Sequence, residues 1–253
     1  MYPEYIAMDL TFGTNVQRRP LFAVAGIDGR NHTFPLLRAF LPSKECIALR
    51  WVILKALPTL LGRDVLDHVS VIASDMEDSI CQSIATGINS GLFPKARHRL
   101  DYYHIFVQPW MRYIRSENSI TKTVFMWIKS WFDQVEKVSE FKKSLNLLQR
   151  YISVHENDMG DILVGALQEI IDRIVGRISY CGNHYFLENT TFGYKGDSIV
   201  ESMNSSMKYG AIPIDSRMGV DRSAFTQMNM AIRQARSKNM YVLLINFIFF
   251  LAL

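Results

Sequence analysis

The chain has 253 residues and contains only three cysteines and little net charge. Cys46, Cys81 and Cys181 are widely spaced and odd in number, so they form neither a disulfide framework nor a Cys-x-x-Cys zinc pattern, and we expect buried, reduced thiols. The formal charge of +4 permits nucleic-acid binding, but a dedicated DNA-binding module is usually more basic. The first residues lack a basic start followed by an apolar run, so we expect no secretory signal peptide.

Long apolar runs are rare as well, and the one exception is Tyr241–Leu253. This run is too short to cross a bilayer comfortably, because a membrane-spanning helix needs roughly 20 residues. Three interpretations stay open: a buried terminal helix or strand, the truncated or misread end of a longer protein, and a short membrane tail. We do not favour the membrane.

The remaining composition is that of an ordered globular protein. Hydrophobic residues make up 49% of the chain and charged residues 21%, which is enough for one substantial core with room for an inserted subdomain. No internal repeat and no low-complexity linker divides the chain.

Apolar patterning predicts five strands and two helices in the first hundred residues. Three strands form an antiparallel meander, a helix follows, and a strand, a helix and a last strand complete the order of a ribonuclease H-like fold. In that fold, the first and fourth strands are parallel neighbours. The predicted strands are Tyr5–Leu10, Leu21–Ile27, Thr33–Leu41, Val69–Ser74 and His98–Tyr103. The predicted helices are Lys44–Leu57, with Ser43 as N-cap and with Pro58 ending or kinking it, and a second one with Ile80, Ile84 and Ile88 on one face.

Residues 110–195 have few strand signals, and we interpret them as a mostly helical insertion. Its clearest helix is Asp158–Ile178, which we expect to bury an Ile/Leu stripe against Trp127, Trp131 and Phe132. The expected organisation is therefore a core over 1–109, the insertion over 110–195, the last core helices over 196–240 and the apolar tail over 241–253. The stripe contains Ile162, Ala166, Ile170 and Ile174, with Leu163, Leu167, Ile171 and Val175 beside it, and the last core helices are expected near Ser198–Lys208 and Ser223–Ser237.

Three acidic residues stand where a metal site could form. Asp9 and Asp75 end strand-like runs, and Glu201 lies on the polar stripe of a late helix together with Asn204 and Lys208. Carboxylates from two strand ends and a helix are the usual cage for two divalent metals in phosphodiester cleavage. Periodicity alone leaves open whether Glu201 lines this site or is a solvated surface carboxylate.

Residues 8–110 resemble the transposase domain of Mutator-like elements (MULEs), and the similarity extends over about 5–210. Each matching piece is weak, but the ordered set is specific. The pieces are Asp9 with Thr11, Phe12 and Asn15; Pro20-Leu21; Glu45 with Trp51; Ser74-Asp75; Ser83-Ile84-Ala85; Phe93-Pro94; and Glu201-Ser202-Met203-Asn204.

This resemblance implies a DDE-type transposase core that cleaves and joins DNA strands by two-metal phosphoryl transfer. Asp9, Asp75 and Glu201 would be catalytic and would bind Mg²⁺ or Mn²⁺. The partners would be transposon ends and target DNA, with a homo-oligomer forming on the DNA, and the location would be the nucleus.

A second motif, formed by Asp101 and His104, allows several roles. The family carries Cys-x-x-His, or Asp-x-x-His in some branches, where this chain has Asp101 and His104. These two residues could form a hydrogen-bonded brace, touch DNA or metal, or be a strand-end acid and an ordinary structural histidine. We interpret the other histidines as structural or surface residues: His32, His68, His98, His155 and His184.

Basic residues of the insertion are candidates for DNA phosphate contacts. We expect them to be exposed, and Lys142, Lys143 and the late-helix Lys208 are the main candidates. The other basic residues of the insertion that we expect to be exposed are Lys122, Lys129 and Arg150.

Two alternatives to an active transposase remain open. Full-length relatives usually carry an N-terminal zinc-dependent DNA-binding domain and a C-terminal Cys/His zinc module, and this chain shows neither. We therefore expect a truncated, decayed or domesticated copy, whose alternative function is that of a non-catalytic DNA-associated or regulatory protein. A 3′–5′ exonuclease is less favoured, because such enzymes lack so large an insertion before the last acid.

Overall fold

The computed structural model describes residues 2–13, 15–27, 33–101, 104, 108, 137–175 and 247–248. The chain divides into two compact units, the first comprising Met1–His98 with Gly196–Leu253 and the second Arg99–Lys195.

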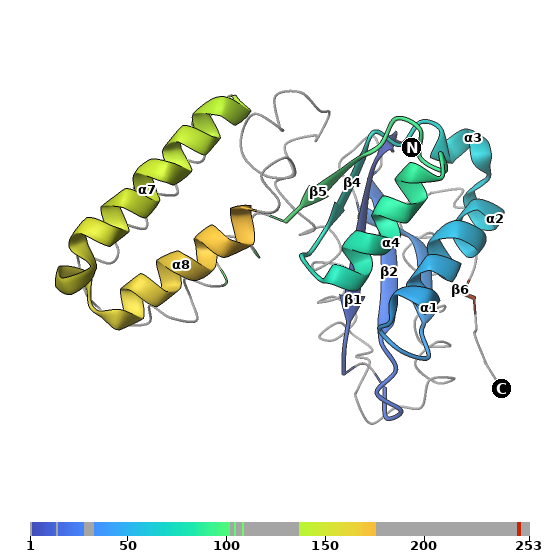
Figure 1. The fold of residues 1–253 in the computed structure, drawn as a ribbon. Helices are drawn as coiled ribbons and strands as arrows, with labels where there is room; N and C mark the ends of the chain where they lie inside the picture. The colour runs from blue at the N-terminus through green and yellow to red at the C-terminus, as the bar shows by residue number, and fades with distance from the viewer. Residues whose placement is uncertain are drawn as a thin grey trace. The chain divides into compact units, whose positions relative to one another are not determined.

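The first unit is built on a mixed β-sheet (Figure 1). Its strands lie in the order β5-β4-β1-β2-β3-β6, and β1–β5 are the five strands that the sequence predicted. This is an α/β architecture compatible with a ribonuclease H-like fold. The bounds are β1 Tyr2–Thr11, β2 Leu21–Ile27, β3 Thr33–Phe40, β4 Val71–Ser74, β5 Arg97–Leu100 and β6 Phe247–Ile248.

The pairing of β1 with β4 positions the backbone next to Asp9 and Asp75. The two strands run parallel, from the pair Tyr5 and Val71 to the pair Met8 and Ser74. The prediction that these strands are neighbours is therefore confirmed. On its other side, β1 pairs antiparallel with β2, and β2 pairs antiparallel with β3, as expected for a meander.

A helical segment connects β3 to β4, and it continues past Pro58, where the sequence predicted an end or a kink. It comprises α1 (Cys46–Trp51), a π-helical turn (Val52–Ala56) and α2 (Leu57–Leu61). Proline lacks an N–H and its ring clashes with the carbonyl four residues earlier. The wider turn just before Pro58, in which the N–H of Leu57 bonds to the carbonyl of Val52, accommodates the proline without ending the helix.

The α4 helix (Asp78–Asn89) ends in a Schellman motif. Gly91 has a positive φ of 72°, its N–H bonds to the carbonyl of Ile88 at 2.9 Å, and the N–H of Leu92 bonds to that of Gly87 at 3.0 Å. The turn brings the buried Phe93 back against Gly87, where an added Cβ would lie 2.9 Å from the Phe93 ring. Gly87 thus provides the space for Phe93.

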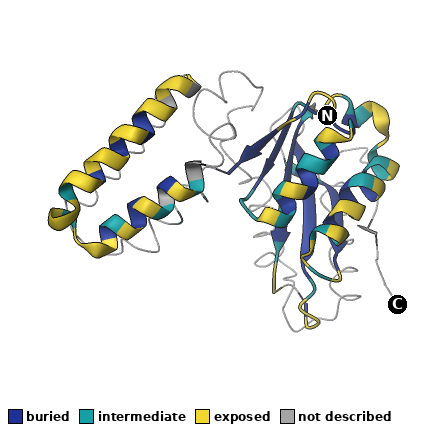
Figure 2. Ribbon diagram, viewed as in Figure 1, coloured by how far each residue is buried: buried dark blue, intermediate teal, exposed yellow. Residues whose placement is uncertain are grey.

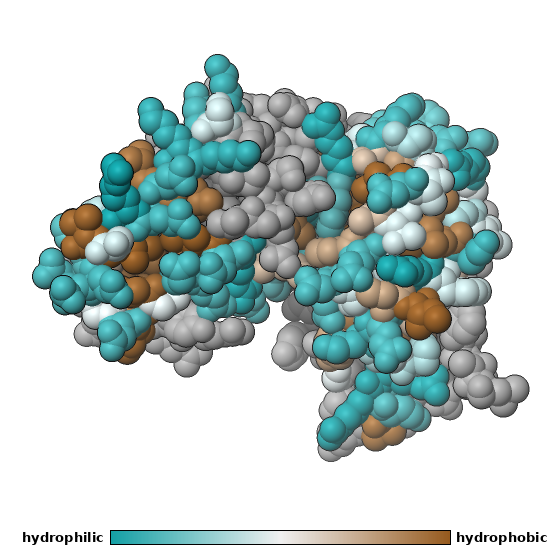
Figure 3. Space-filling view, viewed as in Figure 1, coloured by the Kyte–Doolittle hydropathy of each residue, from teal (hydrophilic) through white to brown (hydrophobic). Residues whose placement is uncertain are grey.

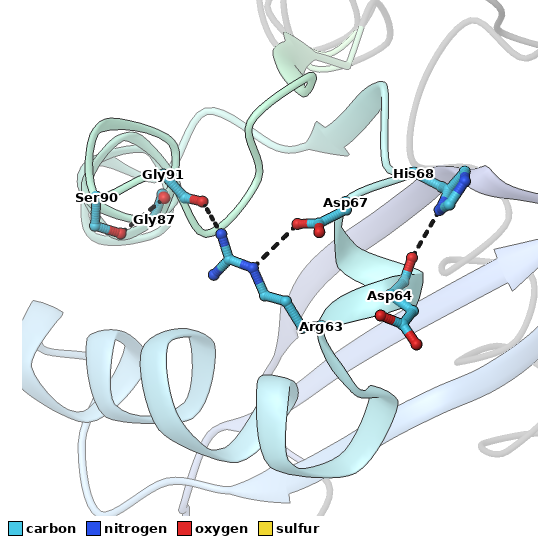
Figure 4. Close-up of polar contacts among 7 residues, drawn as sticks. All are labelled: Arg63, Asp64, Asp67, His68, Gly87, Ser90 and Gly91. Carbon is cyan, nitrogen blue, oxygen red and sulfur yellow. Dashed lines mark hydrogen bonds and ion pairs between the residues drawn. The ribbon is translucent and has the colours of Figure 1, made fainter.

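A polar contact ties this end of α4 to α3 (Arg63–Leu66), as Figure 4 shows. The Arg63 guanidinium donates to Asp67 Oδ1 at 3.0 Å and to the carbonyl of Gly91. Arg63 and Asp67 are largely exposed, and an exposed ion pair contributes at most about 1 kcal/mol. The contact therefore orients the loop more than it stabilises the fold.

The two faces of the sheet differ in composition. One face has large aliphatic residues such as Ile6, Met8 and Ile72, which form a core with Leu49 of α1 and Ile84 of α4. The other face has small residues at the middle of its central strands, between larger ones such as Tyr5, Leu21 and Val71, and all of these are also buried (Figure 2). The small residues include Ala7, Ala23, Ala25 and Ala73, and none of them belongs to the core under the helices.

The second unit contains a helical hairpin of α7 (Val138–Met159) and α8 (Asp161–Val175), which contact each other. The helix predicted to start at Asp158 starts instead at Asp161. Gly160, with φ of 76°, separates the two helices in a conformation that other residues rarely adopt.

The buried face of this hairpin is narrower than the sequence predicted. Leu163, Ala166, Leu167 and Ile171 of α8 are buried, whereas Ile162 is 71% exposed. The α7 helix has its own apolar face, with Leu145, Leu148 and Ile152 buried. Because that face is one stripe wide, Ile162 falls on its solvent side. In Figure 3 hydrophilic side chains cover much of both helices, with apolar patches between them.

Several predictions lie outside the described residues. These include both late helices, Trp127, Trp131, Phe132, Lys122 and Lys129. Of the apolar tail, only Phe247 and Ile248 are described, and they pair parallel with Arg38 and Ala39 of β3. Among the described helices, none is long and apolar enough to span a membrane.

The contact between Gly87 and Phe93 predicts an unusual response to alanine. Gly87→Ala should destabilise the first unit by about 1–3 kcal/mol, because the fully buried Phe93 ring must shift. Gly165→Ala is the control: Gly165 is exposed within α8 and has open space around it, so alanine should stabilise that helix by about 0.5–1 kcal/mol. Urea denaturation followed by circular dichroism measures both, and stabilisation by Gly87→Ala would contradict the packing described.

Candidate active site

Asp9 lies within β1, and Asp75 directly follows the neighbouring strand β4. The parallel register ends at Met8 and Ser74, so each aspartate is the next residue along the chain after this last pair. Neighbouring strands are about 4.8 Å apart. Because side chains alternate, both aspartates follow the alanine pair Ala7 and Ala73 on the face away from the core under the helices.

Each of the two carboxylates is oriented by a short-range hydrogen bond. Thr11, two residues along the same strand face, donates its hydroxyl to Asp9 Oδ2 at 2.8 Å. The backbone N–H of Glu77 donates to Asp75 Oδ1 at 3.1 Å, at the start of α4. Both aspartates are half-buried. They are therefore held in place while remaining partly accessible to solvent.

The backbone of Asp75 is fixed from the opposite face of the sheet. The buried Ser74 hydroxyl donates to the carbonyl of Asp75 at 2.8 Å, and Cys81 Sγ also donates to this carbonyl, at 3.7 Å. The Ser74 oxygen lies 2.8 Å from Nε2 of buried His98 on β5. If the hydroxyl gives its single proton to the Asp75 carbonyl, the neutral His98 ring is the donor in this contact, through Nε2.

His98 is kept neutral by its surroundings. Burial lowers the pKa of its imidazole from 6.5 to about 4, because the charged ring would lose its hydration. The sequence placed His98 only among structural or surface residues. Its link to the site could not be deduced from spacing, since β5 and β4 meet only in the fold.

The loop after β1 is held by Asn15, one of the residues that carry the resemblance to MULE transposases. This buried amide donates to the carbonyl of Arg19 at 2.7 Å and accepts from the N–H of Arg19 at 3.0 Å. Arg18 between them has φ of 54°, a conformation that few non-glycine residues adopt. Asn15 therefore shapes the loop that follows Asp9.

The Asp101 and His104 pair belongs to the second unit and has a different environment. Asp101 is buried, whereas His104 is half-buried. Nδ1 of His104 lies 3.5 Å from Gln108 Oε1, and the carbonyl of His104 accepts from Arg173 at 3.3 Å. Arg173 is in turn paired with Glu169. These contacts connect His104 to α8, and its role at the site stays a prediction.

The other predicted site residues divide into two groups. Lys142 and Lys143 are exposed on α7, as expected, and so is Arg150. Glu201, Asn204 and Lys208 lie outside the described residues. No group of three potential metal ligands forms within the described ranges, so the described part of the site consists of the Asp9 and Asp75 carboxylates. Two adjacent, partly exposed carboxylates fit a hard cation that prefers oxygen ligands, such as Mg²⁺.

Comparison with known proteins identifies the segment that carries this site. Residues 5–108 match the family model described as MULE transposase domain. The matched segment contains β2–β5, β1 from Tyr5 onward, both aspartates, Asn15 and His98. A search of curated proteins returns no match.

The neutral His98 predicts a pH-dependent stability. Below pH 6.5 the unfolded chain binds a proton at this residue and the native state does not, so the free energy of unfolding falls as the pH is lowered from about 6.5 to about 4. The loss is at most about 1.4 kcal/mol per pH unit. His98→Gln should remove this part of the slope in urea denaturation, whereas His68→Gln, at an exposed histidine, should not. Equal slopes in all three proteins would show that His98 is not the titrating group.

Proposed function

The chain contains a MULE transposase domain over residues 5–108, and from this premise we propose that it is the core of a DDE-type transposase. It would cleave and join DNA strands at a site formed by Asp9, Asp75 and Glu201. The observation that supports the proposal is the β1–β4 register, because Asp9 and Asp75 each come one residue after its last pair, Met8 and Ser74.

Each residue has a distinct task in this proposal. Asp9 and Asp75 would hold Mg²⁺ or Mn²⁺, and Glu201 would complete the ligand set. The chemistry that such a pair of cations supplies when bound is activation of the attacking oxygen and stabilisation of the leaving oxygen. Thr11 would keep the Asp9 carboxylate in one orientation, and Ser74 would fix the backbone of Asp75.

The rest of the chain would bind DNA or support the site. We propose that residues 110–195 are an insertion in the core and that its exposed lysines bind phosphates, contacts that position a protein without reading sequence. Asp101, His104 and Asn204 would be auxiliary residues at the site, and Lys208 would contact DNA. Action on chromosomal transposon ends would place the protein in the nucleus, as a homo-oligomer on its DNA.

The carboxylates should differ from structural acids in their response to substitution. Asp9→Asn, Asp75→Asn and Glu201→Gln should each reduce Mn²⁺-dependent nicking of supercoiled plasmid by about 10³-fold or more, because several kcal/mol of transition-state stabilisation is lost. The metal-free variants should be as stable as the native protein or slightly more stable, because repulsion between adjacent carboxylates is relieved.

Metal-induced stabilisation provides a second measurement on the same variants. Mn²⁺ at about 100 times its Kd should raise the free energy of unfolding of the native protein by about 2.7 kcal/mol, and the three variants should lose this gain. Asp64→Asn, at an exposed acid of α3, is the control and should retain both activity and gain. DNA binding without nicking in the native protein would favour the non-catalytic, regulatory alternative. If Glu201→Gln alone retained the gain, Glu201 would be a surface residue.

The exposed lysines of α7 can be tested through the salt dependence of DNA affinity. If Lys142 and Lys143 each contact a phosphate, neutralising both with glutamine should reduce the slope of log K against log salt by roughly 2. Lys55→Gln combined with Lys95→Gln removes the same charge from exposed positions of the first unit and should change the slope less. Equal slopes for the α7 variant and the native protein would show that these two lysines of α7 do not contact DNA phosphates.

A further inference from the structure

Arg38 is an arginine in the interior of the sheet. It lies on β3, only 5% exposed, and its Nε has no hydrogen-bond partner among the residues that the structure describes. Within the described ranges its guanidinium forms no ion pair either. Burial lowers the pKa of Arg38 to about 10, so the side chain remains charged at neutral pH. A buried charge without a partner is costly, and it calls for an anion.

The strand register places Arg38 on the same face as the candidate active site. Asp9 pairs with Ala23 on β2, and Ala23 pairs with Arg38 on β3. Residues directly opposite each other in a sheet share a face, so Asp9, Ala23 and Arg38 form one row across three strands. Leu37 and Ala39, the chain neighbours of Arg38 on β3, belong to the core on the other face. Two strand spacings of about 4.8 Å separate the backbones of Asp9 and Arg38.

The residue between them is small. Ala23 has only a methyl group, so no large side chain of β2 stands between the arginine and the aspartate in this row. The arginine side chain is long and ends in a planar guanidinium. With its donors on one edge, this group is the one best suited to bind two oxygens of a phosphate at once. The row thus has a cation at one end and a half-buried carboxylate at the other.

We propose that Arg38 binds a phosphate group of the DNA strand that is held at Asp9 and Asp75. This inference rests on the proposed function and adds a residue to it. The aspartates would bind the strand through cations, whereas Arg38 would bind a phosphate oxygen directly. It would act in substrate binding, and the phosphate would supply the anion that the buried guanidinium lacks.

A different partner for Arg38 makes the opposite prediction for stability. If an acidic side chain from the undescribed part of the chain neutralises Arg38, removing the arginine leaves that acid buried and unpaired, and the fold is weakened. If the partner is a DNA phosphate, the free protein carries an unpaired charge. Arg38→Met, which keeps most of the apolar volume, should then raise the melting temperature of the free protein.

The first experiment uses inorganic phosphate and metal-free protein. Melting temperatures are measured in EDTA with sodium phosphate or with sodium chloride at equal ionic strength. Phosphate should raise the melting temperature of the native protein more than that of Arg38→Met. The control Arg50→Met removes the same charge at an exposed position of α1 and should respond like the native protein. Equal phosphate effects in all three, or a lower melting temperature for Arg38→Met in chloride, would overturn the proposal.

The second experiment measures affinity for a short DNA duplex in EDTA. Arg38→Met should bind about tenfold more weakly than the native protein, because it loses a charge-assisted bidentate contact. Arg38→Lys keeps the charge without the fork and should lie between the two. Native affinity in Arg38→Met would overturn the proposal even if Asp9→Asn abolishes nicking. Conversely, a native protein that neither nicks DNA nor gains stability from Mn²⁺ would refute the catalytic proposal, and the phosphate response of Arg38 would be judged separately.

Discussion

The parallel pairing of β1 with β4 is the constraint on which the rest of the first unit depends. It joins segments that are far apart in the chain, as the hydrogen bond between Ser70 and the Glu4 carbonyl, 66 residues away, illustrates. Each backbone bond contributes only about 1 kcal/mol. Register is nevertheless strict, because a slip by one residue would move every side chain to the opposite face. Such a slip would turn Asp9 into the core under the helices and destroy both core and site.

The two faces of the sheet carry different side chains. Ile6, Met8 and Ile72 fill one face with branched and long side chains, and the helices α1 and α4 cover it. The other face has buried alanines at its middle, between larger residues such as Tyr5 and Leu21. The acids at its strand ends and the arginine on β3 are on this second face. The alternation of side chains along the same strands thus separates the aliphatic core from the candidate site residues.

Much of the fold could be predicted from the sequence because its strands are rich in apolar and β-branched residues, and because Asp9 and Asp75 directly follow such runs. What could not be predicted depends on contacts between distant segments. The helix passes Pro58 because a π-helical turn precedes it. His98 serves the site through Ser74 only after β4 and β5 have paired, and periodicity gives no sign that Arg38 is buried. The position of Glu201 in the fold stays a prediction.

The position of β1 also determines the order in which the chain can fold during synthesis. The meander β1–β2–β3 consists of neighbouring segments and can form as soon as residues 2–40 have emerged. Until β4 arrives, the future central strand is an open sheet edge with an apolar face, the kind of edge to which other chains can add a strand. Docking of β4 protects this edge and assembles the two aspartates in one step. A nascent chain that ends before β4 therefore has an unprotected edge and is exposed to aggregation before its two aspartates are brought together.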